Sequence, residues 1–283
     1  MGALSGRVAI VTGASRGVGK GCAIELGAAG ATVYVTGRTL TEGSHPLPGT
    51  IDATAAAVTE AGGTGCAVAC DHREDDQVHD LFRRVARECG RLDVLVNNAF
   101  LIPRELTNGK PFYENPISNW DDMIDVGTRS AYVASWHAAH AMVAQGRGLI
   151  VNVSSSGAAK HAWHVAYGVG KCALDRITAD TAHELAPHGV TVVSVWPGLV
   201  MTERTEGIAR VMPDLNVAGA ESQRFTGRAV VALASDPAVA RFNGRAIASR
   251  ALADEYGFTD VDGSLPDGPL HDRHGGTPRP ESR

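Results

Sequence analysis

A glycine-rich turn links an apolar strand to a helix near residue 12 of the sequence. The run Val8-Ala-Ile-Val11 is short and β-branched, which is typical of a buried strand. Thr12-Gly-Ala-Ser-Arg-Gly-Val-Gly19 follows at once, and a helical pattern runs from there to Gly30. Glycines let the backbone approach a pyrophosphate, and a helix N-terminus offers N–H groups and a positive dipole end. This order predicts a dinucleotide-binding unit, with a plain turn as the alternative.

The same alternation of strand and helix continues along the chain. Further strands are expected at residues 32–36, 66–70, 92–96, 149–153, 190–196 and 244–249. Helices are expected at 51–61, around 78–85, at 118–145, from 167 onward and at 228–235. Such alternation predicts a parallel sheet with ligands at the carboxyl ends of its strands. We therefore expect an α/β fold: a single Rossmann-type, doubly wound parallel sheet of about seven strands with helices on both faces.

Length and local composition suggest one domain followed by a tail. A chain of 283 residues can bury a large core, and we place the domain at residues 1–263. Residues 203–224 contain Met, Pro and mixed charge with weak periodicity, which fits a mobile flap over the substrate. From Ser264 the chain is rich in Gly, Pro and His, so we expect residues 264–283 to form a disordered C-terminal tail.

Charge and composition argue against several functions. The net charge of −5 and pI near 6.1 disfavour binding to nucleic acid or to an anionic membrane. We expect neither a secretory signal nor a membrane span, because apolar runs are too short. Five cysteines without a CxxC pair suggest reduced thiols and a cytoplasmic location. His137 and His140 have no acidic or cysteine partner nearby in sequence, so no metal is expected.

A Tyr/Lys pair on one helix face is the candidate for proton transfer. Tyr167 and Lys171 are four residues apart, so they lie one helical turn from each other. Tyrosine has a pKa near 10, and an ammonium one turn away would lower the pKa of the phenol. A hydroxyl from Ser154 or Ser155, at the end of the preceding strand, could hold a substrate oxygen beside it. The alternative is a chance pair on a surface helix.

Two arginines bear on the choice of cofactor. An NAD site usually has an acid after the second strand, but here the strand ends in Gly37-Arg38-Thr39. Arg16, in the glycine turn, offers a second guanidinium. Two arginines suit a 2′-phosphate, so NADP(H) is favoured and NAD(H) is the alternative. Both could instead be ordinary solvent-exposed arginines. Asp71 lies at a strand's carboxyl end, where it could meet adenine or only cap a helix.

Four motifs, in order, resemble those of the short-chain dehydrogenase/reductase family over roughly residues 5–250. They are a TGxxxGxG turn at 12–19, NNA at 97–99, YxxxK at 167–171 and PGxxxT at 197–202. The resemblance implies that Tyr167 is the proton donor or acceptor, that Lys171 lowers its pKa and binds the nicotinamide ribose, and that Ser155, with Ser154 as alternative, orients the substrate oxygen. It implies cofactor contacts at Gly13, Ser15, Arg16, Gly17, Val18, Gly19, Arg38, Thr39, Asp71, Asn98, Ala99, Tyr167, Lys171, Pro197, Gly198, Val200 and Thr202.

Two residues depart from the family pattern. Gly127 stands where the family usually has an asparagine that helps hold a water linked to the lysine, and Phe100 replaces the last glycine of NNAG. Gly127 keeps the backbone carbonyl but removes the side chain and loosens the helix.

The resemblance implies hydride transfer between a nicotinamide and a small carbonyl or alcohol substrate. The alternative is a nucleotide-binding or regulatory protein of the same fold with little turnover. Excess apolar surface on the helix at 118–145 suggests a homodimer or homotetramer.

Overall fold

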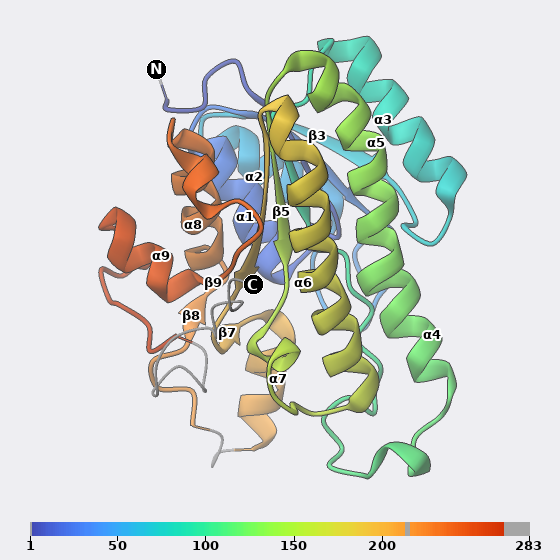
Figure 1. Ribbon diagram of the computed structural model, residues 1–283. Coiled ribbons are helices and arrows are strands. Elements are labelled where there is room, and N and C mark those ends of the chain that lie inside the picture. The colour runs from blue at the N-terminus through green and yellow to red at the C-terminus, as the bar shows by residue number, and fades with distance from the viewer. Residues whose placement is uncertain (1, 213–215, 269–283) are drawn as a thin grey trace.

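The computed structural model describes residues 2–212 and 216–268, and a seven-stranded parallel sheet forms its centre (Figure 1). Along the sheet the strand order is β3-β2-β1-β4-β5-β6-β9. The expected α/β fold with about seven parallel strands is therefore confirmed. The strands are β1 Val8–Val11, β2 Thr32–Gly37, β3 Thr64–Ala69, β4 Val94–Asn97, β5 Gly148–Val153, β6 Val190–Trp196 and β9 Ala246–Ala248.

Helices cover both faces of the sheet (Figure 1). Helices α1, α2 and α8 pack their buried apolar side chains on one face, and α3, α5 and α6 pack on the other. Each face buries its own apolar cluster, which is why the central strands are apolar on both sides. The helices are α1 Gly17–Ala28, α2 Ile51–Glu60, α3 Asp75–Cys89, α4 Ser118–Ile124, α5 Ser130–Gln145, α6 Val165–Leu185, α7 Glu203–Val211, α8 Phe225–Ser235 and α9 Ser249–Tyr256.

The carboxyl ends of β1, β4, β5 and β6 carry the segments of interest. The strand order turns at β1 and β4, and ligands bind beyond such a switch point in open α/β sheets. Helix α7 and the short parallel pair β7 (Val200–Met201) and β8 (Glu221–Ser222) lie beyond these ends, at the bottom of Figure 1. The topology thus places the glycine turn, the Ser/Tyr/Lys segment and the 197–202 turn together at the carboxyl-terminal end of the sheet.

The structure differs from the sequence expectations at residues 118–145 and 203–224. The helix expected at 118–145 is divided by a π-helical turn, Asp125–Arg129, with Gly127 at its centre. A π turn inserts an extra residue per turn and is common at functional sites. Residues 203–224, expected to lack strong periodicity, contain α7 and β8. Of the expected disordered tail at 264–283, residues 269–283 lie outside the described part of the chain.

Candidate active site

The glycine turn is held against the end of β4 by close backbone packing. A Cβ on Gly13 would lie 2.7 Å from the Ala99 Cα, and one on Gly19 would lie 2.3 Å from the Asn98 Nδ2. The Asn98 amide donates to the carbonyls of Thr12 and Gly13, both at 2.9 Å. The Thr12 hydroxyl accepts hydrogen bonds from the backbone N–H groups of Asn98 and Ala99. Only glycine fits these positions, so the turn has the tight backbone that a pyrophosphate cradle needs.

A carboxylate occupies the start of α1. The Gly17 backbone N–H donates to the Glu203 Oε2 at 2.9 Å. Thr202, the residue before Glu203, caps α7 by accepting from the Thr205 N–H at 3.2 Å. The first N–H groups of a helix attract anions. Glu203 therefore occupies a hydrogen-bond donor, the Gly17 N–H, that is suited to a cofactor phosphate. Glu203 was not among the residues predicted from the sequence, since nothing local in the sequence ties α7 to α1.

Of the other predicted cofactor residues in the turn, Ser15 is buried beside the end of β2, and Val18 is half-buried against the core. Both therefore hold the turn on the sheet through their side chains.

Arg16 and Arg38 converge on the end of β2. Arg16 donates to the Thr39 Oγ1 at 3.1 Å and to the Gly49 carbonyl at 2.8 Å. Arg38 forms an ion pair with Asp71 at 3.5 Å, and its side chain is about half exposed. The two arginines and Thr39 therefore share one corner of the site, where the sequence predicted recognition of a 2′-phosphate.

Ser155, rather than Ser154, faces the phenol of Tyr167. The Ser155 hydroxyl lies close enough to the Tyr167 phenol to lower the pKa of that phenol. Ser154 is buried and turned the other way, where its hydroxyl donates to the Lys171 carbonyl at 3.3 Å. Of the two serines left open by the sequence, Ser155 is therefore the one beside the candidate proton donor.

Burial dominates the electrostatics of the Tyr/Lys pair. Burial raises the pKa of Tyr167 to about 12, and the hydrogen bond from Ser155 only partly offsets this rise. The expectation of a lowered pKa for this phenol is therefore wrong for the protein by itself. Burial also lowers the pKa of Lys171 to about 8, with Asp175 opposing the change. A lysine that is partly neutral near pH 8 exerts less pull on the phenol than a full ammonium does.

Lys171 is enclosed by backbone and by an aromatic ring. Its ammonium group donates to the Val153 carbonyl at 2.9 Å and lies 4.7 Å from the centre of the Phe100 ring. The Phe100 ring also meets Tyr167 edge-on, with ring centres 5.7 Å apart. Phe100 thus touches both members of the pair.

The turn at residues 197–202, predicted to contact the nicotinamide, depends on a second carboxylate that was not predicted from the sequence. Pro197 and Gly198 follow β6, and the Gly198 N–H donates to the Glu221 Oε1 at 2.7 Å. Glu221 is fully buried, and it also accepts from Ser249, on α9, and from Thr226, on α8. Val200 is buried in β7, directly opposite Glu221 in the β7–β8 pair. A buried acid whose hydrogen-bond donors lie in three other segments of the chain has no signature in local sequence.

Aromatic side chains line the mouth of the site. Trp163 is half exposed, and its ring lies 5.0 Å from that of Tyr167. Its φ of 58° is in the left-handed region, which a bulky residue rarely adopts. A cavity of about 580 Å³ opens beside it, between the 109–112 loop and the 161–165 segment.

Within residues 2–212 and 216–268, no helix is long and apolar enough to cross a membrane. The same residues contain no cluster of three or more His, Cys, Asp or Glu side chains suited to a metal ion.

Comparison with known proteins gives consistent matches over most of the chain. The sequence profile of short chain dehydrogenases matches residues 7–211. Mouse dehydrogenase/reductase SDR family member 1 is 45% identical over 275 residues, which cover 92% of this chain and 85% of the relative. A 3-oxoacyl-(acyl-carrier-protein) reductase from Synechocystis is 30% identical over 248 residues, covering 87% of this chain and 96% of the relative. A short-chain type dehydrogenase/reductase from Mycobacterium marinum has a similar crystal structure, with a TM-score of 0.73 and 26% identity, covering 87% of this chain and 94% of that one.

Proposed function

Because this chain belongs to the short-chain dehydrogenase family, a family of oxidoreductases, we propose that it is an NADPH-dependent carbonyl reductase. It reduces a ketone or aldehyde and, in reverse, oxidises the corresponding alcohol. The observation that carries the proposal is the cluster of Ser155, Tyr167 and Lys171 at the carboxyl ends of the sheet, beside the glycine turn. The Synechocystis relative reduces an oxo group according to its name, which fits a carbonyl substrate.

The three side chains divide the proton chemistry. Ser155 donates a hydrogen bond to the substrate oxygen and holds it beside the phenol. Tyr167 gives its proton to that oxygen during reduction and removes it during oxidation. Lys171, one turn away, stabilises the phenolate left behind. When bound, the nicotinamide cofactor supplies or accepts the hydride at C4.

The glycine turn fits this cofactor, and the end of β2 favours its phosphorylated form. A Cβ at Gly13 or Gly19 would clash with Ala99 or Asn98 behind the turn, so these glycines keep the backbone tight, as a pyrophosphate-binding turn requires. Arg38 and Arg16 supply positive charge for a 2′-phosphate, and Thr39 lies within reach of Arg16. NAD(H) is the alternative cofactor, and the arginines are the reason that we place it second.

A Tyr167→Phe variant tests the proposal most directly. We expect fluorescence titration to show tighter binding of NADPH than of NADH, and a panel of ketones and aldehydes to reveal turnover. Tyr167→Phe should lower kcat at least about 100-fold, because general acid catalysis contributes about that much or more. Tyr132→Phe, on the exposed face of α5, is the matched control. Unchanged turnover in Tyr167→Phe would refute the assignment.

A binding protein of the same fold is the second candidate. The ring of Phe100 crowds both Tyr167 and Lys171, which favours a site that holds nucleotide but turns over slowly. NADPH binding without reduction of any carbonyl in the panel would support this second candidate over the first.

We also propose that the protein is a cytoplasmic homodimer or homotetramer. The outer face of α5 exposes the large side chains of Tyr132 and Trp136, which suit a subunit interface. All five cysteines are free thiols, as expected in a reducing compartment. Sedimentation velocity of the purified protein would give the number of subunits, and a monomer would contradict the oligomer.

A further inference from the structure

Phe100 and Gly127 occupy one space between them. A Cβ built on Gly127 would lie 2.7 Å from the Phe100 Cδ2 and 3.0 Å from its Cε2. Carbon atoms in proteins do not approach so closely, so a side chain at residue 127 and this ring position exclude each other. Gly127 is at the centre of the π turn Asp125–Arg129, which brings its backbone against the ring.

The same ring faces the buried ammonium of Lys171. The Lys171 Nζ lies 4.7 Å from the ring centre, within the range of a cation–π contact. The lysine side chain is buried, so water screens this attraction little. Among the described residues, its hydrogen-bond acceptor is the Val153 carbonyl. An ammonium has three donors, and one backbone acceptor alone fixes its position poorly.

We propose that Phe100 is a positioning residue for Lys171, and that Gly127 is a glycine because the ring needs its space. The inference rests on the proposed function, since Lys171 matters there as the partner of Tyr167. It also joins the two departures from the family pattern into one exchange. The family pattern has a side chain at residue 127 and a glycine at residue 100. This chain has the reverse, a glycine at 127 and an aromatic ring at 100, and the face of that ring lies beside the lysine.

The chemistry of the ring differs from that of a polar partner. An aromatic face attracts a cation but carries no charge and exchanges no proton. It therefore steadies the ammonium without neutralising it. The Asp175 carboxylate, one turn further along α6, accepts hydrogen bonds from the Ser194 hydroxyl at 2.6 Å and from the Trp196 indole N–H at 3.0 Å. Phe100 thus holds the cation on the side toward Tyr167, whose ring it also contacts.

A size-exchange cycle tests the shared space by thermal unfolding. We expect Gly127→Ala to lower the melting temperature by about 5 °C, because the added methyl group overpacks a space that the Phe100 ring already fills. In a Phe100→Ala background the same Gly127→Ala change should cost little, because the methyl group then has room. An equal loss in both backgrounds would refute the matched pair. The readout needs neither cofactor nor substrate.

A lysine titration tests the contact with the ring. The chain has four lysines, so NMR with ¹³C-labelled lysine can resolve Lys171, which Lys171→Arg would assign. Phe100→Leu keeps an apolar side chain but removes the π face. The pKa of Lys171 should therefore fall by about half a unit to one unit. Phe100→Tyr keeps the face and should restore the value. An unchanged pKa in Phe100→Leu would overturn the positioning role.

These measurements separate this inference from the proposed function. If no carbonyl is reduced but the cycle and the titration behave as expected, the proposed activity fails and the role of Phe100 stands. If carbonyls are reduced, Phe100→Leu should lower kcat and shift the lysine-dependent limb of its pH profile downward, and Phe100→Tyr should recover both. Turnover with an unshifted profile in Phe100→Leu would refute the inference alone.

Discussion

The Glu203 carboxylate places a negative charge at the N-terminus of α1, where the proposed cofactor would place its phosphate groups. Its Oε2 accepts from the Gly17 N–H at 2.9 Å, at the positive end of α1. A phosphate approaching this helix would meet the carboxylate and compete with it for the same donor. The residue therefore links binding of the cofactor to the position of α7, the helix that begins at Glu203.

Neutralising this carboxylate should strengthen cofactor binding. We expect Glu203→Gln to lower the Kd for NADPH about 2- to 5-fold, which matches the usual energy of one charge at a helix end. Isothermal titration calorimetry at low salt would measure it. Glu206→Gln, on the same helix and paired at the surface with Arg210, is the matched control. Weaker binding in Glu203→Gln would mean that the carboxylate supports the cofactor site rather than competing for it.

Glu221 joins four parts of the chain. It lies in β8 and accepts hydrogen bonds from the turn after β6, from α8 and from α9. Next to it, Asp260 accepts from the Ser222 N–H at 2.7 Å and ties the segment after α9 to β8. The position of the 197–202 turn thus depends on elements far along the chain.

The burial of Glu221 should give stability a distinct pH dependence. Burial raises its pKa to about 7, against hydrogen bonds from Ser249, Gly198 and Thr226 that lower it. A carboxyl whose folded pKa is raised contributes stability that is complete below its unfolded pKa and is lost as pH rises through the folded value. We expect its contribution to the free energy of unfolding to fall by about 3 kcal/mol between roughly pH 4.5 and pH 7.

Comparison with Glu221→Gln isolates this effect from other titrating groups. Urea unfolding of both proteins from pH 5 to pH 8 should show the wild type losing stability relative to the variant as pH rises. Glu60→Gln, at an exposed position at the end of α2, is the control for removal of one negative charge. A constant difference between wild type and Glu221→Gln over this range would contradict the assignment.

Local sequence patterns predicted the strands of the sheet. β1, β2 and β6 are short, apolar and bounded by glycine or proline, so their positions followed from residues near each other in sequence. The same holds for Tyr167 and Lys171, which one helix brings together. These features need only local periodicity.

Contacts between segments far apart in the sequence could not be predicted from local periodicity. Glu203 meets Gly17 across 186 positions of the chain, and Phe100 fills the space at Gly127 because a π turn brings the two segments together. The pKa of Tyr167 was predicted in the wrong direction because burial depends on all surrounding elements, while only the neighbouring lysine was visible in sequence. Whether each predicted site residue acts as assigned stays a prediction.

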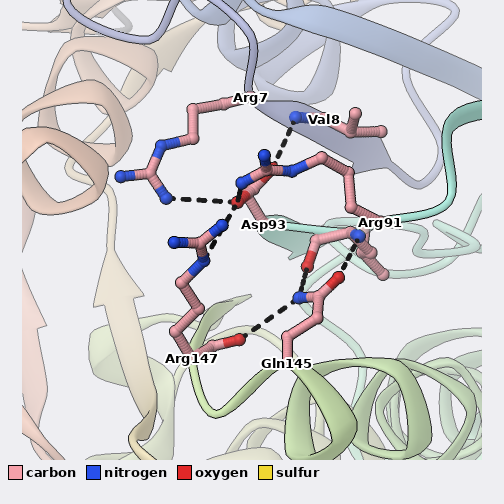
Figure 2. Close-up of polar contacts among 7 residues, drawn as sticks. Arg7, Val8, Arg91, Asp93, Gln145 and Arg147 are labelled. Atoms are coloured by element: carbon pink, nitrogen blue, oxygen red, sulfur yellow. Dashed lines mark hydrogen bonds and ion pairs between the residues drawn. The ribbon is translucent and has the colours of Figure 1, made fainter.

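The amino-terminal end of the sheet, opposite the candidate site, is stabilised by a buried acid, Asp93, just before β4 (Figure 2). Its side chain is 2% exposed and accepts from Arg91 at 2.8 Å, from Arg7 at 3.1 Å and from the Val8 N–H at 2.9 Å. Burial alone would raise the pKa of Asp93, but these hydrogen bonds outweigh it and lower the pKa. Its contribution to stability is therefore present above the unfolded pKa and lost as pH falls through the folded value.

Removing this acid should weaken the fold without touching the proposed active site. We expect Asp93→Asn to lower the free energy of unfolding by about 3 kcal/mol at pH 7, because it leaves the arginines around it without their counter-ion. Urea unfolding measures this loss. Arg147→Ala, which removes only a half-exposed partner at 4.0 Å, should cost less than about 1 kcal/mol. Since the acid lies at the amino ends of the strands, NADPH titration of folded Asp93→Asn should give the wild-type Kd. A weaker Kd would mean that the two ends of the sheet are coupled.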